Sequence, residues 1–355
     1  MKLFYLLLSM MLVAVAVGEI HKAEGQRKRN ALHLGCALYD FDENFSMAPT
    51  VSVAQLRELI KTAGSTVRIL DATYRERPAM SREAFQADWY GKVEKAQREW
   101  MSDAYLKEHL PNAAFFNCEA ATYPGQYEKS SLYPADIFAQ YVRLLGVNKG
   151  DTVVVYARGA CSGMLWAARA WWLLKVYGME RVHVLEGGLD RWKAEGGQVV
   201  DGPATIQPGN WDSSAPDAKL FVSFDDLFGN PAKVNDTYPT QINLLDARPA
   251  GQFNGTEPLS FDPNGAPGFH IPHSLNIPLP TLFTQGGELK SEAELAQILT
   301  TAGIVSSKPL VTMCNGGTQA SLLGLACVKA DKQFRLFNGS LREVSLRAPQ
   351  LISDK

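Results

Sequence analysis

One cysteine stands out as a candidate nucleophile because of the residues around it. Cys314 follows the short apolar run Leu310 to Met313, and Asn315-Gly316-Gly317-Thr318-Gln319 comes directly after it. A cysteine acts as a nucleophile in its thiolate form, and backbone N–H groups at the start of a helix stabilise an anion. The spacing therefore predicts a loop that holds a thiolate, or another sulfur anion formed on Cys314.

The elements that must position Cys314 can be predicted from the same stretch. Leu310 to Met313 is short and mostly apolar, which is typical of a buried strand. The segment after Gly317 has helical apolar spacing, so we expect a helix to begin there. We expect Gly316 and Gly317 to let the backbone approach the sulfur closely, since glycine has no side chain to block it.

Length and composition indicate a globular protein of two domains. The chain has 355 residues, with 46% hydrophobic and 20% charged residues. Its 35 basic and 37 acidic residues give a net charge of −2, so no overall field favours nucleic acid as a partner.

The N-terminus has the pattern of a targeting segment. Lys2 precedes an apolar run from Leu3 to Val17, which predicts a signal peptide over residues 1–18, with a retained anchor as the alternative. A polar leader over residues 19–47 would follow. We therefore expect a protein that is secreted or held in the lumen of the secretory pathway, without stable membrane insertion after cleavage.

The second half of the chain repeats the first half in order. The matched segments are 68–73 with 243–248, 108–115 with 269–276, 151–156 with 308–313, and 181–189 with 334–341. Apolar strand segments alternate with helical segments in both halves, which predicts parallel sheets. We place the domains at residues 48–198 and 219–350, joined by a linker at 199–218 that is rich in Gly, Pro and Ser.

The repeat also serves as an internal control. Ala157 in the first half aligns with Cys314, so the first domain lacks the nucleophile. The other cysteines are Cys36, Cys118, Cys161 and Cys327, and their pairing is left open.

Several motifs together resemble the rhodanese superfamily. They are Asp246 to Pro258, Gly268 to Pro272, the Cys314 loop, Asn338-Gly339-Ser340 and, in the first half, Val184 to Trp192. The resemblance spans roughly residues 50–350 and is greatest to the group of two-domain thiosulfate and 3-mercaptopyruvate sulfurtransferases. It implies an α/β fold of two tandem rhodanese-like domains, each a parallel sheet with helices on both faces.

The resemblance further implies that Cys314 carries sulfur as a persulfide between a small-molecule donor and a thiol or cyanide acceptor. Asn315, Gly316, Gly317, Thr318 and Gln319 would form the persulfide loop. The resemblance implies neither a metal nor an organic cofactor. The predicted substrate-binding residues are Arg169, Arg248, His109 and Tyr127.

The loop departs from the sequences usual in either sulfurtransferase group. No basic residue directly follows Cys314 in the loop, which disfavours a doubly charged donor and favours 3-mercaptopyruvate or a similar thiol donor. Two alternatives remain open: thiosulfate:cyanide transfer, and a degenerate rhodanese module that binds a thiol or a protein partner without turnover.

Overall fold

The computed structural model describes residues 48–78, 80–229, 240–261 and 268–352. The predicted signal peptide and polar leader, and Cys36 with them, lie outside these ranges. In the part of the chain that is described, no helix combines the length and the apolar character needed to cross a membrane.

A five-stranded parallel sheet forms the centre of the first domain. Its strands lie in the order β1 (Thr50–Val51), β7 (Val182–Leu185), β6 (Thr152–Tyr156), β2 (Val67–Asp71) and β3 (Ala114–Phe115). Runs such as Val153 to Tyr156 are apolar throughout because both faces of the sheet are covered.

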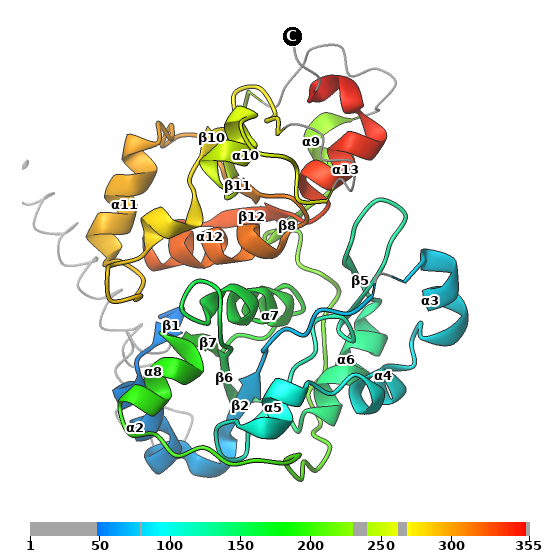
Figure 1. The fold of residues 1–355 in the computed structure, drawn as a ribbon, viewed down its shortest axis with the longest axis vertical. Helices are drawn as coiled ribbons and strands as arrows, with labels where there is room; N and C mark the ends of the chain where they lie inside the picture. The colour runs from blue at the N-terminus through cyan, green and yellow to red at the C-terminus, as the bar shows by residue number, and fades with distance from the viewer. Residues whose placement is uncertain (1–47, 79, 230–239, 262–267, 353–355) are drawn as a thin grey trace, which may run out of the picture. The chain divides into compact units, whose positions relative to one another are not determined.

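Helices cover both faces of this sheet (Figure 1). The helices of the first domain are α2 (Val53–Ala63), α3 (Arg82–Asp88), α4 (Val93–Glu99), α5 (Asp103–Lys107), α6 (Ala135–Leu144), α7 (Met164–Val176) and α8 (Gly188–Ala194), with the 3-10 turn η1 (Gly64–Thr66). A small antiparallel hairpin, β4 (Thr122–Tyr123) and β5 (Ser131–Leu132), adds a loop that reaches the second domain.

The second domain repeats this plan. Its parallel sheet has the order β10 (Leu275–Asn276), β9 (Asn243–Asp246), β11 (Leu310–Met313), β12 (Phe334–Phe337) and β8 (Phe221–Val222). Its helices are α9 (Phe224–Phe228), α10 (Ala250–Asn254), α11 (Glu292–Thr301), α12 (Thr318–Lys329) and α13 (Ser340–Arg347), with the 3-10 turns η3 (Leu279–Leu282) and η4 (Pro349–Leu351).

Alternate residues of the second sheet point to different cores. Leu245 and Leu336 pack on the side of α11 and α12, whereas Leu244 and Phe337 pack on the side of α9 and α13. This is the period-two alternation of side chains along a strand. The predicted fold, two parallel-sheet domains with helices on both faces, is confirmed.

The two domains pack against each other through α7 and α12 (Figure 1). Both helices are apolar on nearly all sides, which is typical of helices that are buried all round. Within the second domain, α12 also packs closely on β12 at Gly324, where a Cβ would lie 2.1 Å from the ring of Phe334. One continuous hydrophobic core therefore runs through both domains.

The predicted linker at 199–218 is packed onto the first domain. Trp211 is 6% exposed, and its backbone N–H donates to Val147 O at 3.0 Å. Arg143 donates through Nε to Trp211 O at 2.8 Å. The Gly and Pro content correctly indicated an irregular segment, but tertiary contacts hold it along its length. The exact domain boundaries stay a prediction.

Candidate active site

Cys314 lies immediately after β11, at the carboxyl edge of the second sheet. Its side chain is 1% exposed, and the backbone N–H of Gly317 donates to Sγ at 3.1 Å. Gly317 has φ 92° and immediately precedes α12, so it is in the left-handed region that favours glycine. The sulfur therefore sits against a backbone N–H at the start of a long helix, a setting that stabilises a sulfur anion.

The first turn of α13 fixes the Cys314 loop from the other side. Cys314 N–H donates to Ser340 Oγ at 3.2 Å, and Leu341 N–H donates to Cys314 O at 3.0 Å. Arg342 N–H donates to Asn315 O at 3.1 Å. Backbone N–H groups in the first turn of α13, which have no partner within the helix, thus bond to the carbonyls of the Cys314 loop. The loop and α13 therefore form one rigid unit.

A cavity of about 900 Å³ opens in front of this loop, and both domains line it. The second domain contributes Ser260, Phe261, Cys314, Asn315, Gly316, Thr318, Gln319 and Arg342. The first domain contributes, among others, Tyr74, Arg77, Cys118, Glu119, Glu128, Lys129, Ser130, Trp166 and Arg169. The basic residues that are missing from the loop are therefore supplied to the cavity by other elements.

Arg169, on α7, is the predicted substrate-binding residue that does line this cavity. It is 2% exposed, its guanidinium lies 4.8 Å from the Trp172 ring centroid, and Nη2 donates to Asn338 Oδ1 at 2.8 Å. Its Nη1 is buried and has no partner among the described residues. Burial lowers the pKa of Arg169, and the nearby thiols of Cys118 and Cys314 act in the opposite direction. A buried guanidinium with a free donor is a site for an anionic oxygen.

Asn338 connects the two domains at this site, and sequence reasoning assigned it no such role. Its Oδ1 accepts from Arg169, while Nδ2 donates to Glu128 Oε1 at 3.1 Å and to Ser130 O at 2.8 Å. The side chain is 1% exposed. Its place in Asn338-Gly339-Ser340 was the available signal, but the two acceptors of its Nδ2 come from a hairpin more than 200 residues earlier.

The two loop glycines differ in what they allow. A Cβ on Gly317 would lie 2.9 Å from Asn338 Oδ1 and 3.1 Å from Arg169 Nη1. A Cβ on Gly316 would meet nothing closer than Lys129 Cβ at 3.8 Å. Close approach therefore requires glycine at 317 but not at 316. Asn315 donates to Gln252 Oε1 at 2.8 Å, and its own Oδ1 is buried without a partner among the described residues.

The structure places the other three predicted substrate-binding residues outside the cavity lining. Arg248 is fully buried and pairs with Asp246, with Nη2 and Oδ2 2.6 Å apart. Both ring nitrogens of His109 lie 2.8 Å from backbone carbonyls, those of Leu110 and Gly202. These contacts hold turns and strand ends together.

Tyr127 belongs to the loop that does line the cavity, but its own ring lies elsewhere. The guanidinium of Arg347 is 5.1 Å from its ring centroid, and Gln126 donates to its hydroxyl at 3.0 Å. Its neighbours Glu128, Lys129 and Ser130 face the cavity instead. Arg248, His109 and Tyr127 are thus partnered in the fold, and none of them is brought to Cys314.

The four described cysteines are free thiols. Cys118 lines the cavity, and burial raises the pKa of its thiol to about 12. Burial likewise raises the pKa of Cys327 to about 12 and raises that of Cys161. These thiols are therefore neutral at ordinary pH. In the first domain, Ala157 is fully buried at the position equivalent to Cys314.

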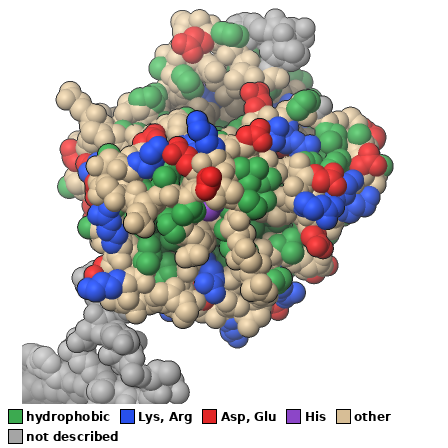
Figure 2. All heavy atoms as spheres, turned by 60° about the horizontal axis from the view of Figure 1, so that its bottom comes forward, with side chains coloured by type: hydrophobic (Ala, Val, Ile, Leu, Met, Phe, Trp, Pro, Cys, Tyr) green, Lys and Arg blue, Asp and Glu red, His purple; other side chains and the backbone are tan. Residues whose placement is uncertain are grey.

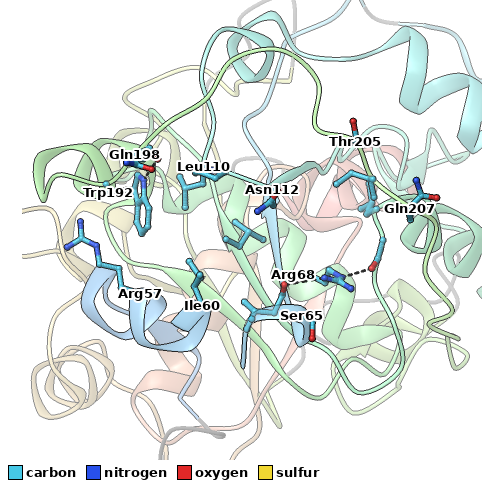
Figure 3. Close-up of a pocket in the computed structure, with 18 of the residues that line it drawn as sticks. Arg57, Ile60, Ser65, Arg68, Leu110, Asn112, Trp192, Gln198, Thr205 and Gln207 are labelled. Carbon is cyan, nitrogen blue, oxygen red and sulfur yellow. Dashed lines mark hydrogen bonds between the residues drawn. The ribbon is translucent and has the colours of Figure 1, made fainter. Parts of the chain in front are cut away.

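A second cavity of about 650 Å³ lies within the first domain, next to α2 (Figure 3). Its two arginines both have partners: Arg57 donates to Glu195 O at 2.7 Å, and Arg68 lies 3.1 Å from an oxygen of Asp151.

On the face shown in Figure 2, acidic and basic side chains are interspersed. No cluster of three or more metal-binding side chains occurs in the described ranges.

Comparison with known proteins identifies the family. The model of the Rhodanese-like domain matches residues 52–195 and 231–346. The thiosulfate sulfurtransferase of Gallus gallus is 33% identical over 310 residues, covering 84% of this chain and 94% of the relative. The 3-mercaptopyruvate sulfurtransferase of Escherichia coli K12 is 31% identical over 252 residues, covering 70% of this chain and 84% of the relative.

A solved structure agrees with these sequence relatives. The crystal structure of SseA from Escherichia coli, described as a 3-mercaptopyruvate sulfotransferase, superposes with a TM-score of 0.61 at 28% identity. The superposed region covers 82% of this chain and 98% of SseA. With two matched domains, relatives above 30% identity over most of their length and the same two-sheet fold, this chain belongs to the rhodanese family of sulfurtransferases.

Proposed function

We propose that the protein is a sulfurtransferase that moves a sulfane sulfur from a small anionic donor to a thiol or cyanide through a persulfide on Cys314. One observation carries the proposal: Sγ of Cys314 accepts the Gly317 N–H in the cavity that Arg169 also lines, with its free Nη1. The names of the relatives point to the same chemistry.

The favoured donor is 3-mercaptopyruvate or a similar thiol donor. Arg169 would hold its carboxylate, and the Cys314 thiolate would attack its sulfur. The new S–S bond forms as the donor's C–S bond breaks, and the electron pair and a proton end on the carbon that becomes the methyl group of pyruvate. The Gly317 N–H then stabilises the persulfide anion until an acceptor thiolate or cyanide removes the outer sulfur.

Thiosulfate:cyanide transfer is the second candidate, and the charge of the cavity favours it more than the loop sequence did. Lys129 and Arg342 line the cavity together with Arg169, although no basic residue directly follows Cys314. A degenerate module that binds a thiol or protein partner without turnover is the outcome that would contradict both candidates.

A test of sulfur transfer starts with purified protein, 3-mercaptopyruvate and dithiothreitol, and measures sulfide release. Wild type should release sulfide, and C314S should not. The matched control is C327S, because Cys327 is equally buried but does not line the cavity. Peptide mass spectrometry should find one added sulfur on Cys314 after donor treatment. Equal sulfide release by wild type and C314S would refute the catalytic role.

Localisation in the secretory pathway also belongs to this proposal. It rests on the predicted signal peptide over residues 1–18. Sequencing of the mature N-terminus in a eukaryotic secretion host should begin at Glu19. A mature chain that still begins at Met1 would contradict cleavage.

A further inference from the structure

Buried polar atoms without partners gather around the Cys314 cavity. Five side-chain nitrogen or oxygen atoms in the described part of the chain are buried and unpartnered. Three of them, Arg169 Nη1, Asn315 Oδ1 and Arg342 Nε, belong to residues that line this cavity. Because a buried polar atom without a partner is unfavourable, such a concentration indicates groups that a ligand satisfies.

Arg342 differs from Arg169 in the element that carries it. It lies in the first turn of α13, and its backbone N–H is bonded to Asn315 O, one residue after the nucleophile. Its Nε is buried and has no hydrogen-bond partner among the described residues. Arg169 belongs to the first domain, so the two guanidinium groups reach the cavity from opposite domains.

The carboxylates that line the cavity do not neutralise Arg342. Glu128 accepts from Asn338 and from Ser131, and Glu119 accepts from Tyr74 at 3.1 Å and pairs with Arg77 at 3.8 Å. Glu76 and Glu83 also line it and are exposed to solvent. Arg169 and Arg342 therefore each keep an unused donor for a ligand that carries negative charge.

We propose that Arg342 is a donor-selecting residue that binds the second negative charge of a doubly anionic sulfur donor of the thiosulfate type. The inference rests on the proposed sulfurtransferase function and deepens its second candidate, transfer from thiosulfate. The cation that the loop after Cys314 lacks is provided by α13. A guanidinium suits this role because its charge is permanent and its N–H groups match the geometry of oxyanions.

The reaction would balance without any further reactant. The Cys314 thiolate attacks the outer sulfur of thiosulfate, a new S–S bond forms, and the S–S bond of the donor breaks. The electron pair leaves with sulfite, which carries the charge that Arg342 and Arg169 face.

The test compares two donors that differ by one charge. Thiosulfate is a dianion, whereas methanethiosulfonate has a methyl group in place of one charged oxygen and transfers its sulfur by the same bond changes. In R342Q, kcat/KM for thiosulfate should fall about tenfold further than kcat/KM for methanethiosulfonate, since only the dianion loses a charge-assisted hydrogen bond to its second charge. R342K should recover part of the difference. The control is R98Q, because Arg98 is exposed and lies outside the cavity lining.

A second measurement separates this inference from the proposed function. Thiosulfate binding to C314S, which cannot take up the sulfur, should weaken by a similar factor when R342Q is added. If wild type transfers no sulfur but this binding difference is present, the site stands and the proposed function fails. Equal losses for both donors in R342Q, or unchanged thiosulfate binding to the double variant, would overturn the role of Arg342.

Discussion

The substitution N338D tests whether the contact between the domains sets the donor site. The change keeps the size of the side chain and replaces Nδ2 with a charged oxygen. Nδ2 of Asn338 donates to Ser130 O at 2.8 Å and to Glu128 Oε1 at 3.1 Å, and Oδ1 accepts from Arg169 at 2.8 Å. The substitution therefore turns two attractive contacts into repulsive ones and gives Arg169 an internal counter-ion.

The contact distances set the expected magnitude. At an effective dielectric constant of about 20, the new repulsion from Glu128 at 3.1 Å is about 5 kcal/mol and the new attraction to Arg169 at 2.8 Å is about 6 kcal/mol. These two terms nearly cancel. The lost hydrogen bonds remain, about 1 kcal/mol for the carbonyl and about 2 kcal/mol for the carboxylate. We expect the free energy of unfolding to fall by about 3 kcal/mol.

The same substitution should weaken donor binding, because Arg169 is then neutralised by its neighbour. We expect KM for 3-mercaptopyruvate or thiosulfate to rise about tenfold or more, from the loss of one charge-assisted hydrogen bond. Urea denaturation measures the stability, and steady-state kinetics on the folded protein measures KM.

The matched control is N276D in the same domain. Asn276 Nδ2 also donates to two carbonyls, those of Asp246 and Arg248, at 3.0 and 2.9 Å, but Asn276 does not line the cavity. It should lower stability and leave KM unchanged. If N338D loses stability yet keeps the KM of wild type, Arg169 does not hold the donor and the reasoning fails.

Two further predictions concern buried groups. R248Q should lower the free energy of unfolding by about 3–5 kcal/mol, because it leaves Asp246 buried without its partner, while KM for the donor stays unchanged; urea denaturation and kinetics check this, and a raised KM would show that Arg248 does reach the donor. At pH 8, iodoacetamide should leave Cys118 and Cys327 unmodified in the native protein, because burial raises the pKa of each thiol to about 12 and keeps it neutral; peptide mass spectrometry would detect the contradictory result, modification of Cys118 as fast as that of Cys314.

The local part of the site could be predicted from sequence because it lies in one stretch. The apolar run Leu310 to Met313 forms β11 with the predicted ends, and Cys314 and Gly317 take up the predicted contact. The internal repeat predicted two domains of one fold because short strands and helices recur in the same order. Local patterns of this kind determine the type of each strand and helix and their order along the chain. They were sufficient to predict the fold of both domains and the position of Cys314.

The charged part of the site could not be predicted in the same way. No basic residue directly follows Cys314, and the cations of the cavity come from elsewhere: Arg342 from α13 and Lys129 from a hairpin of the other domain. Arg248 was predicted as a substrate-binding residue from the family resemblance. In the structure its guanidinium forms a buried ion pair with Asp246, two residues earlier. Which buried arginine keeps a free donor is decided by tertiary packing.

The buried amide of Asn338 has a consequence for a chain that enters the secretory pathway. Asn338-Gly339-Ser340 has the pattern of an acceptor site for N-glycosylation. In the folded protein the side chain is 1% exposed, and its nitrogen donates to Glu128 and Ser130, which leaves no room for a sugar. In a chain with the proposed secretory localisation, folding and glycan attachment would compete for one nitrogen, and a glycan there would keep the two domains from packing around Cys314.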